Sequence, residues 1–396
     1  MNFYIISLIK AGLVAFVLLT ALAYLQWIER KVLAHIQLRV GPQRVGPHGL
    51  LQPLADVIKL MTKEDLLPDH VNKFFYMLAP FLAVFMALIS IAVIPFGPEV
   101  EIMGVKTWMQ LTDLKIGILF VLAISSVGVY GVALAGWSSN NKYSLIGGLR
   151  SSAQMISYEL PMALAIASPL LLANTLSFRE MVNMQDGYYL AVIPRWMIFQ
   201  MPMPQIFSFF IFLIAAFAET NRVPFDLPEA ENELVAGFHT EYSSMKFAAF
   251  FMAEYANMVT VTAVGTLLFL GGWHPIFPAE YGSKFVPALV FGLAGAIAIF
   301  HGLNPARPFD RITLPIAGVL FLGIAAIFMV PFLQPYLLPL FWFCGKVLVL
   351  LFVFIWIRGT LPRFRYDQLM HFAWTFLFPA ALLNLLFTAL LVAWNS

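Results

Sequence analysis

The sequence has little charge and almost no cysteine. Of its 396 residues, 23 are Lys or Arg and 21 are Asp or Glu, so only 11% are charged. Soluble domains contain about 25% charged residues, so the composition excludes a soluble fold of this length. The single cysteine, Cys344, excludes a disulfide, a zinc site held by cysteines and an iron–sulfur cluster within the chain.

Long apolar stretches take the place of the missing charge. Hydrophobic residues make up 61% of the sequence, and a helix needs roughly 20 of them to cross ~30 Å of hydrocarbon. We therefore expect an all-α fold, a polytopic transmembrane helix bundle that forms one integral membrane domain over residues 1–396. Ten candidate spans lie at about 3–28, 75–96, 116–137, 154–174, 204–219, 246–271, 286–303, 314–333, 338–357 and 372–393. The sequence contains no alternating strand-type pattern, which disfavours a β-barrel.

Basic residues are shared unequally between the two sets of loops. The loops after spans 1, 3, 5, 7 and 9 contain fifteen Lys and Arg residues, against five in the opposite loops. Because cytoplasmic loops carry the excess of positive charge, we expect both termini on the non-cytoplasmic side of a bacterial-type inner (plasma) membrane. The first apolar run is too long for a cleavable signal, so we expect it to be retained. A net charge of +2 and the lack of a basic tract indicate no nucleic-acid partner.

One segment between spans 1 and 2 is predicted to be a helix that does not cross the membrane. Within residues 49–64, apolar side chains recur at helical spacing and face away from Asp56, Lys59 and Lys63. This pattern is typical of an amphipathic helix at the cytoplasmic interface.

Acidic residues gather in the loop at 219–243. Six acids and one arginine, Arg222, give the segment 219–241 a net charge of −5. Carboxylates this dense, if packed partly out of water, repel one another and hold protons near neutral pH, which suits a proton relay. A solvated acidic loop is the alternative.

Two further carboxylates, Glu159 and Glu254, lie inside apolar spans, and Glu219 closes span 5. A carboxylate within a bilayer is costly unless it is paired, protonated or hydrated. We therefore expect a hydrated acidic track, with a purely structural hydrogen-bonding role as the alternative. Lys346, also inside a span, either extends to the interface or belongs to a proton path.

Two basic segments follow spans 1 and 9. We expect Arg39 and Arg44 to face an anionic partner or a polar head group. The alternative is that they only anchor the loop on the cytoplasmic side. Arg358 and the segment 362–368 either supply counter-charges for the acidic loop or act as a positive-inside anchor. The seven histidines show no pair with metal-ligand spacing, and no nucleotide-binding or nucleophile motif is found.

Several of these segments together resemble one family. In chain order, they are similar to the H-type membrane subunit (subunit 1) of proton-pumping NADH:quinone oxidoreductase, respiratory complex I. The segments are Glu29–Lys31, Gly41–Glu64, Gly148–Glu159, Ala218–Tyr242, Phe250–Tyr255 and Pro362–Met370.

The resemblance implies a chain that is not catalytic alone and contains no FMN, iron–sulfur cluster or metal. It implies the membrane-side wall and entrance of a quinone chamber, with ubiquinone or menaquinone as substrate. Span 1, the helix at 49–64 and span 6 frame the entrance from the lipid. The implied partners are membrane lipid and other complex I subunits, namely the peripheral-arm subunits at the quinone site and the small membrane subunits that lead to antiporter-like ones.

The resemblance also assigns residues. The quinone-chamber residues are Arg30, Arg39, Arg222, Phe225, Asp226, Arg363 and Arg365. The proton-path residues are Glu159, Glu219, Glu229, Glu231, Glu233, Glu241 and Glu254.

The sequence departs from the family pattern between about 274 and 339. The family has eight crossings and the sequence indicates ten, so we expect an inserted transmembrane hairpin, with spans 286–303 and 314–333. Two added crossings return the chain to the same side of the membrane, so the segment 362–368 is still cytoplasmic and faces the acidic loop. The alternative functions are the membrane subunit of an energy-converting hydrogenase and a freestanding cation/proton antiporter.

Overall fold

The computed structural model describes residues 2–102, 104–190, 192–201, 203–226, 235–305 and 309–395. Within these residues, nine helices are long and apolar enough to cross a membrane, and a tenth apolar helix, α7 (Ile206–Glu219), has 14 residues. The all-α, multi-pass membrane fold is therefore confirmed. The long helices are α1 (Asn2–Ile36), α3 (Lys73–Ile91), α4 (Gly117–Ser138), α5 (Lys142–Ala173), α9 (Ser244–Phe269), α10 (Val286–Leu303), α11 (Asp310–Met329), α12 (Gln334–Thr360) and the C-terminal run ending in α14 (Phe378–Asn395).

Each of the ten predicted spans coincides with one of these helices, although some boundaries differ. The largest difference is in α5, which begins at Lys142 rather than near residue 154. The side chain of Asn141 caps the helix by accepting a hydrogen bond from the Tyr143 amide at 2.9 Å. The polar first half of α5 is therefore part of the same continuous helix as the apolar second half.

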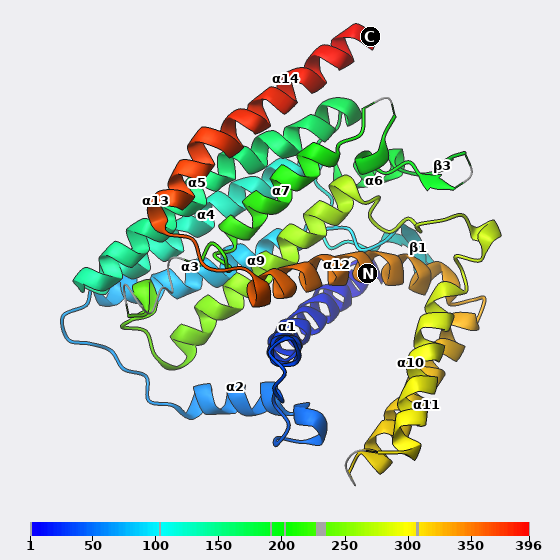
Figure 1. Cartoon of the computed structure of the whole chain (residues 1–396), viewed down its shortest axis with the longest axis horizontal. Helices are drawn as coiled ribbons and strands as arrows, with labels where there is room; N and C mark the ends of the chain where they lie inside the picture. Colours follow the sequence, from blue (N-terminus) through cyan, green and yellow to red (C-terminus); the bar gives the residue numbers. More distant parts are fainter. Residues whose placement is uncertain are drawn as a thin grey trace.

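Helices α3, α4, α5, α7, α9 and α14 form the main bundle, and most of them run in a similar direction (Figure 1). Small residues let α4 and α5 approach closely, as is common between membrane helices. A Cβ atom added to Gly136 would lie 2.6 Å from the Ser144 carbonyl oxygen and 3.0 Å from the Gly148 Cα. A larger side chain at this crossing would force the two helices apart.

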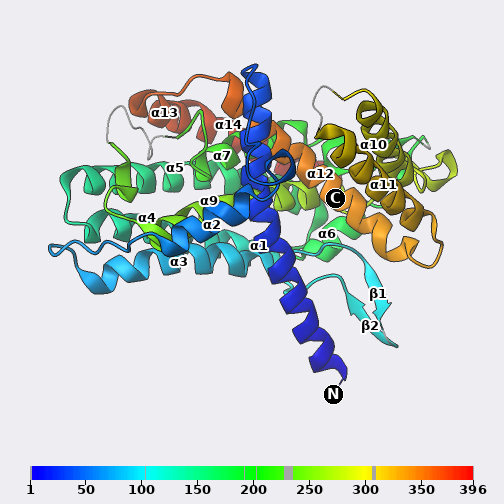
Figure 2. The same cartoon turned by 90° about the horizontal axis from the view of Figure 1, so that it is seen from below.

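Helix α1 crosses the main bundle instead of running along it. It is seen end-on in Figure 1, and Figure 2 shows it standing across α3, α4 and α5. It packs against α9, α12 and the short helix α2 (Gln52–Thr62). Its last turns therefore lie where segments from distant parts of the sequence meet.

Helices α10 and α11 form a hairpin that stands apart from the main bundle (Figures 1 and 2). The two helices pack mainly against each other, and α11 also contacts α12. The tip of the hairpin is held by His48, whose Nε2 lies 3.3 Å from an Asp310 carboxylate oxygen and 3.2 Å from the Thr313 hydroxyl. That this hairpin is an insertion relative to the family stays a prediction.

The loops contain several short elements, including strands that the sequence analysis did not expect. β1 (Glu99–Ile102) pairs antiparallel with β2 (Val105–Trp108), and β3 (Tyr188–Tyr189) with β4 (Ile193–Pro194). These ribbons are too short to give a clear alternation in the sequence, and they leave the all-α fold class unchanged. The other elements are η1 (Pro47–Gly49), α6 (Phe178–Met184), η2 (Met197–Phe199), η3 (Gly237–His239), η4 (Ala279–Tyr281), α13 (Tyr366–His371) and a π-helix at Phe372–Leu377.

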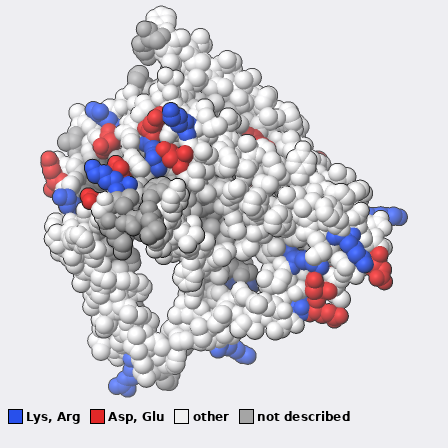
Figure 3. All heavy atoms as spheres, turned by 180° about the vertical axis from the view of Figure 1, so that it is seen from behind, with Lys and Arg blue, Asp and Glu red and all other residues white. Residues whose placement is uncertain are grey.

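Helix α2 falls within the range predicted for the amphipathic helix. Its apolar side chains, such as Leu54, Ile58 and Met61, are exposed by 52–65%. On the face shown in Figure 3, charged side chains gather in separate groups at the margins and leave a broad uncharged surface between them. This is the distribution expected of a surface that faces lipid. The position of α2 at the membrane interface stays a prediction.

Candidate functional site

A buried ionic cluster lies at the last turns of α1 and centres on Glu29, whose residue exposure is 3%. One carboxylate oxygen of Glu29 accepts a hydrogen bond from Arg358 of α12 and lies 3.4 Å from Nη1 of Arg222. The other oxygen accepts a hydrogen bond from the Tyr255 hydroxyl of α9 at 2.8 Å. The Arg222 guanidinium also lies over the Tyr255 ring, 4.2 Å from its centroid. We call these four residues the Glu29 cluster.

The segment after α7, residues 220–226, carries Arg222 into the cluster. Its backbone is held by Gln154 of α5, whose side-chain amide donates to the carbonyl oxygens of Ala218 at 2.8 Å and Phe225 at 2.7 Å. The same amide lies 3.2 Å from the Asn221 side-chain oxygen. Because one buried side chain bonds to three points, the position of this segment is tightly fixed.

The segment 361–365 packs on the other side of residues 220–226. Arg363 pairs with Asp226 at 3.1 Å, and the Phe364 amide donates to the Pro224 carbonyl at 3.1 Å. The rings of Phe225 and Phe364 stack with centroids 5.6 Å apart. The basic segment therefore faces the beginning of the acidic loop, as the sequence predicted.

Two acidic residues of the predicted proton path meet neighbouring serines of α4. Glu219, at the end of α7, accepts a hydrogen bond from the Ser125 hydroxyl. Glu159, on α5, accepts one from the Ser126 hydroxyl. The serines bring together carboxylates that lie 60 residues apart in the sequence, between three packed helices.

A cavity of about 60 Å³ adjoins Glu219. This volume is larger than the roughly 10–15 Å³ that a single buried water needs. Its polar lining comes from α3, α4, α7, α9 and the turn after α7, and consists of Ser90, Ser125, Glu219, Thr220, Asn221, Glu254, Asn257 and Thr260. Glu219 and Glu254 thus line the same cavity inside the helix bundle, whose wall is mostly apolar and carries these two carboxylates among a few polar groups.

The far end of the acidic loop is anchored by buried aromatic residues. Burial lowers the pKa of His239, on η3, to about 3, so its imidazole is neutral at physiological pH. Its ring lies 3.8 Å from that of Phe238, measured between centroids. Burial raises the pKa of Tyr242 to about 12, and its ring stacks on Tyr76 at 4.2 Å. His239 and Tyr242 therefore contact the bundle as neutral groups.

Four predicted site residues bind groups outside the Glu29 cluster. Arg30 pairs with Asp56 of α2 at 2.9 Å, and Arg39 donates to Gln37 at 2.7 Å. Arg365 lies 3.7 Å from Asp367, and Glu241 accepts a hydrogen bond from Asn141 at 2.7 Å. Their assigned roles stay predictions. Glu229, Glu231 and Glu233 lie outside the described residues, and so does Arg307.

Two residues of the Glu29 cluster, Glu29 and Tyr255, receive no site role from the sequence. Arg358 is expected only as a counter-charge for the acidic loop or as an anchor, and the structure pairs it with Glu29 of α1 instead. Glu29 and Arg358 stand at the ends of apolar spans, where a charge is equally typical of an interfacial anchor. In the sequence, Tyr255 stands out only as the last residue of the segment Phe250–Tyr255 that resembles the family. The missing information is their mutual contact, since Glu29 and Arg358 are 329 residues apart.

Comparison with known proteins identifies the family. A model of the NADH dehydrogenase family matches residues 9–389. The chain is 68% identical over 395 residues to the NADH-quinone oxidoreductase H-type subunit, copy 1, of Solibacter usitatus (strain Ellin6076), covering 100% of this chain and 98% of that protein. It is 50% identical over 401 residues to copy 2 of the same type of subunit in Koribacter versatilis (strain Ellin345), covering 99% and 98%. It is 46% identical over 370 residues to the H-type subunit of Protochlamydia amoebophila (strain UWE25), covering 93% and 92%.

The chain belongs to the NADH dehydrogenase family. Its Solibacter relative matches over the whole chain, including the α10–α11 hairpin. The predicted family resemblance is therefore confirmed. Among the described residues, no three or more His, Cys, Asp and Glu side chains are grouped so that they could hold a metal ion.

Proposed function

We propose that this chain, a membrane subunit of NADH-quinone oxidoreductase, forms the membrane-side wall and entrance of a quinone chamber. Its buried carboxylates then couple quinone reduction to proton translocation. One observation carries the proposal: Arg222 belongs to the Glu29 cluster, and Glu219, three residues earlier, lines the internal cavity that Glu254 also lines. A single short segment therefore joins a cationic site to a proton-accepting one.

The chemistry of the Glu29 cluster suits a quinone. A quinone that takes up two electrons develops negative charge on its oxygens, and fixed guanidinium groups nearby stabilise that charge. Negative charge near Arg222 also favours protonation of carboxylates in the adjoining low-dielectric cavity. Glu219, Glu254 and Glu159 are placed to respond by taking up or passing on protons.

The route from the lipid runs between α1, α2 and α9. Arg30 and Asp56 join α1 to α2, while the Ser244 hydroxyl of α9 donates to the Leu60 carbonyl of α2 at 2.8 Å. The exposed apolar side chains of α2 give the isoprenoid tail of the quinone a surface at the edge of this route. Quinone, of either the ubiquinone or the menaquinone class, is thus the substrate, and the redox cofactors belong to other subunits.

The proposed setting is supported by the family membership and by the excess of basic residues in the loops after the odd-numbered spans. The chain lies in a bacterial-type inner membrane, with both termini on the non-cytoplasmic side. Its neighbours are peripheral-arm subunits that deliver electrons at the quinone site and small membrane subunits that lead to antiporter-like ones. Labelling of cysteines introduced near each terminus in intact cells tests the orientation, since a membrane-impermeant reagent reaches them only from outside.

Two substitutions test the function in membranes that contain the assembled enzyme. We expect Arg222→Ala to lower NADH:quinone activity by about 100-fold, the scale of losing one preorganised charge-stabilising donor. We expect Glu219→Gln to abolish proton pumping. Glu280→Gln, at an exposed position on η4, is the control.

NADH:ferricyanide activity, which does not need the quinone chamber, should be unchanged in all three variants. Normal quinone reduction and pumping by assembled Arg222→Ala and Glu219→Gln enzymes would contradict the proposal. Bound quinone in the gently purified complex separates this function from that of a hydrogenase subunit. Transport by the isolated chain in liposomes would instead support an antiporter.

A further inference from the structure

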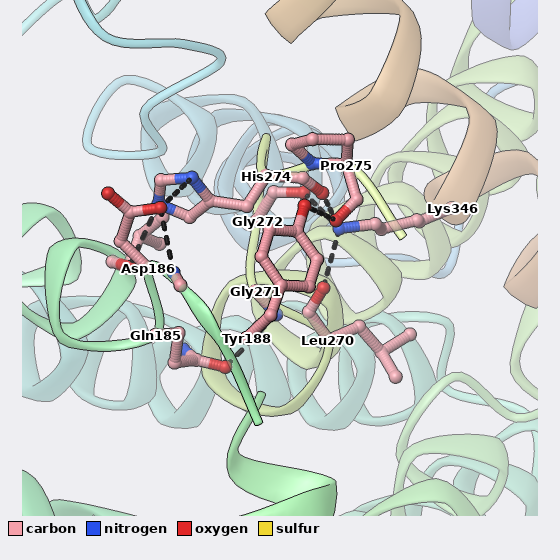
Figure 4. Close-up of polar contacts among 11 residues, drawn as sticks. Gln185, Asp186, Tyr188, Leu270, Gly271, Gly272, His274, Pro275 and Lys346 are labelled. Carbon is pink, nitrogen blue, oxygen red and sulfur yellow. Dashed lines mark hydrogen bonds and ion pairs between the residues drawn. The ribbon is translucent and has the colours of Figure 1, made fainter. Parts of the chain in front are cut away.

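Lys346 lies near the middle of α12, yet its residue exposure is only 7% and its side chain turns into the protein. Figure 4 shows its ammonium group directed at the turn that follows α9. The Nζ atom donates to the carbonyl oxygens of Leu270 at 2.6 Å, Gly272 at 2.9 Å and His274 at 2.6 Å. Each of the three ammonium protons therefore has an acceptor, and we call these three carbonyls the carbonyl cradle.

The local sequence explains why the three carbonyls point the same way. Gly271 and Gly272 have φ values of +69° and +52°, which other residues rarely adopt, and the turn they form directs alternate carbonyls to one side. A Cβ atom on Gly271 would lie 2.2 Å from the Trp196 ring. The ring of Trp196 also lies under the Lys346 ammonium, with its centroid 4.1 Å from Nζ.

The other polar groups of this turn are bound by α6 and the residues around it. Gln185 accepts from the Gly271 amide at 3.0 Å and donates to the Leu267 carbonyl at 2.8 Å. The His274 ring bonds to the Val182 carbonyl at 3.2 Å. These bonds fix the turn from one side (Figure 4), and Lys346 binds it from the side of α12.

The cradle and the ammonium group compensate for each other inside an apolar span. A helix ends with unbonded carbonyls and a partial negative charge, and in a membrane such groups need donors from the protein. A lysine in a span is equally costly without partners. Their contact ties α12 to the end of α9 with three charge-assisted hydrogen bonds.

The same two helices meet again in the Glu29 cluster, through Arg358 of α12 and Tyr255 of α9. Lys346 and Arg358 are twelve residues apart, or about 18 Å along the helix axis. The pair of helices is therefore fixed by polar contacts at two separate levels.

We propose that Lys346 is a positioning residue, a tethered cation that sets the register of α12 on α9 and thereby keeps Arg358 on Glu29. The effect on quinone activity rests on the proposed function of the Glu29 cluster. We call the contact between Lys346 and the carbonyl cradle the clamp. The clamp rests only on the contacts of Lys346, and its effect on thermal stability is measurable without quinone.

The test uses three variants of the intact complex. Lys346→Ala deletes a fragment equivalent to n-propylammonium and leaves the cradle empty. Lys346→Met fills the space with an apolar side chain, and Lys346→Gln keeps two N–H donors without the charge. We expect quinone kcat to fall in the order wild type, Gln, Met, with Met about 10- to 100-fold below wild type, as when a reacting group is displaced by ~1 Å. NADH:ferricyanide activity should not change.

Added n-propylammonium should restore both the thermal stability and the quinone activity of Lys346→Ala, because it supplies the missing donors. Tetramethylammonium, which has no N–H group, should restore neither, and Lys346→Met should not respond to either cation. Combining Lys346→Met with Arg358→Ala should reduce activity no further than Arg358→Ala alone, because the two residues act in series.

Equal stability and quinone activity in the Met, Gln and wild-type enzymes would overturn the clamp. So would additive effects in the double variant, or rescue by tetramethylammonium as strong as that by propylammonium. If Arg358→Ala retains quinone activity while propylammonium still stabilises Lys346→Ala against heat, the clamp stands and the role of the Glu29 cluster fails.

Discussion

Replacing Glu29 with Gln gives the sharpest test of the ionic cluster. The change keeps the volume of the side chain but removes the negative charge between Arg222 and Arg358. The side chains of Glu29 and Arg222 are only 4% and 7% exposed, so water cannot replace the lost carboxylate at either of them. Arg358 is 30% exposed and is partly compensated by solvent.

The expected cost of Glu29→Gln follows from the burial of Glu29, Arg222 and Arg358. Removing one partner of a buried ion pair costs about 3–5 kcal/mol, because the remaining charge is left without compensation. The partial exposure of Arg358 favours the lower end, about 3 kcal/mol, which corresponds to roughly a 100-fold loss of the native arrangement. The Tyr255 hydroxyl can still donate to the amide oxygen of Gln, so its contribution changes little.

The assay compares NADH:quinone and NADH:ferricyanide activities in membranes with equal amounts of assembled enzyme. We expect Glu29→Gln to lower the first by roughly 100-fold and to leave the second unchanged. The double variant Glu29→Gln/Arg358→Ala should be less impaired than the sum of the two single effects, because it also removes one uncompensated cation. Normal quinone kcat and KM in Glu29→Gln, or additive effects in the double variant, would refute the reasoning.

Three further predictions concern the surroundings of the site. His239 has a pKa of about 3 when folded and about 6.5 when unfolded, so it destabilises the folded chain as pH falls below 6.5, by about 2 kcal/mol at pH 5. His239→Phe should remove this share of the acid sensitivity, which is measured by comparing heat inactivation at pH 5 and pH 7.5. Ile58→Asp, on the exposed apolar face of α2, should raise the KM for a long-tailed quinone more than for a short-tailed one; an equal change in both would contradict the access route. His48→Ala should increase hydrogen exchange in the first turn of α11 without lowering quinone activity, and unchanged exchange would show that the contact with Asp310 does not hold the hairpin.

The sequence predicts the helices well because a span in lipid has to be apolar and continuous. All ten apolar stretches form helices, and the intramembrane carboxylates Glu159 and Glu254 stand out because charge there is rare. Boundaries are less predictable, as in α5, where a polar first half continues the helix. The β1–β2 ribbon escapes prediction because a pair of four-residue strands gives no usable pattern.

The ionic cluster could not be predicted because its members are far apart in the chain. Nothing in the segment Glu29–Lys31 indicates that Glu29 turns inward to Arg358, 329 residues away, while Arg30 turns outward to Asp56. Adjacent charges at a helix end point in different directions because the helix rotates by about 100° per residue. Which of them is buried depends on the packing of α9 and α12 against α1, which only the structure provides.

The short distance between Arg222 and Glu219 indicates how the Glu29 cluster is connected to the cavity beside Glu219. The residues are separated by three peptide units, about 10 Å of chain at most, and the turn between them is bonded to Gln154. A segment held this firmly transmits a displacement of Arg222 to the lining of the cavity beside Glu219 without a rearrangement of whole helices. In the proposed scheme, the contact of Lys346 with the carbonyl cradle serves the same end from the other side, because the Glu29 cluster responds to a change of charge only while α12 keeps its register on α9. The buried charges of Glu29, Arg222 and Lys346 join helices that are distant in the sequence. Under the proposed function, that fixed frame lets one small segment connect quinone chemistry to proton movement.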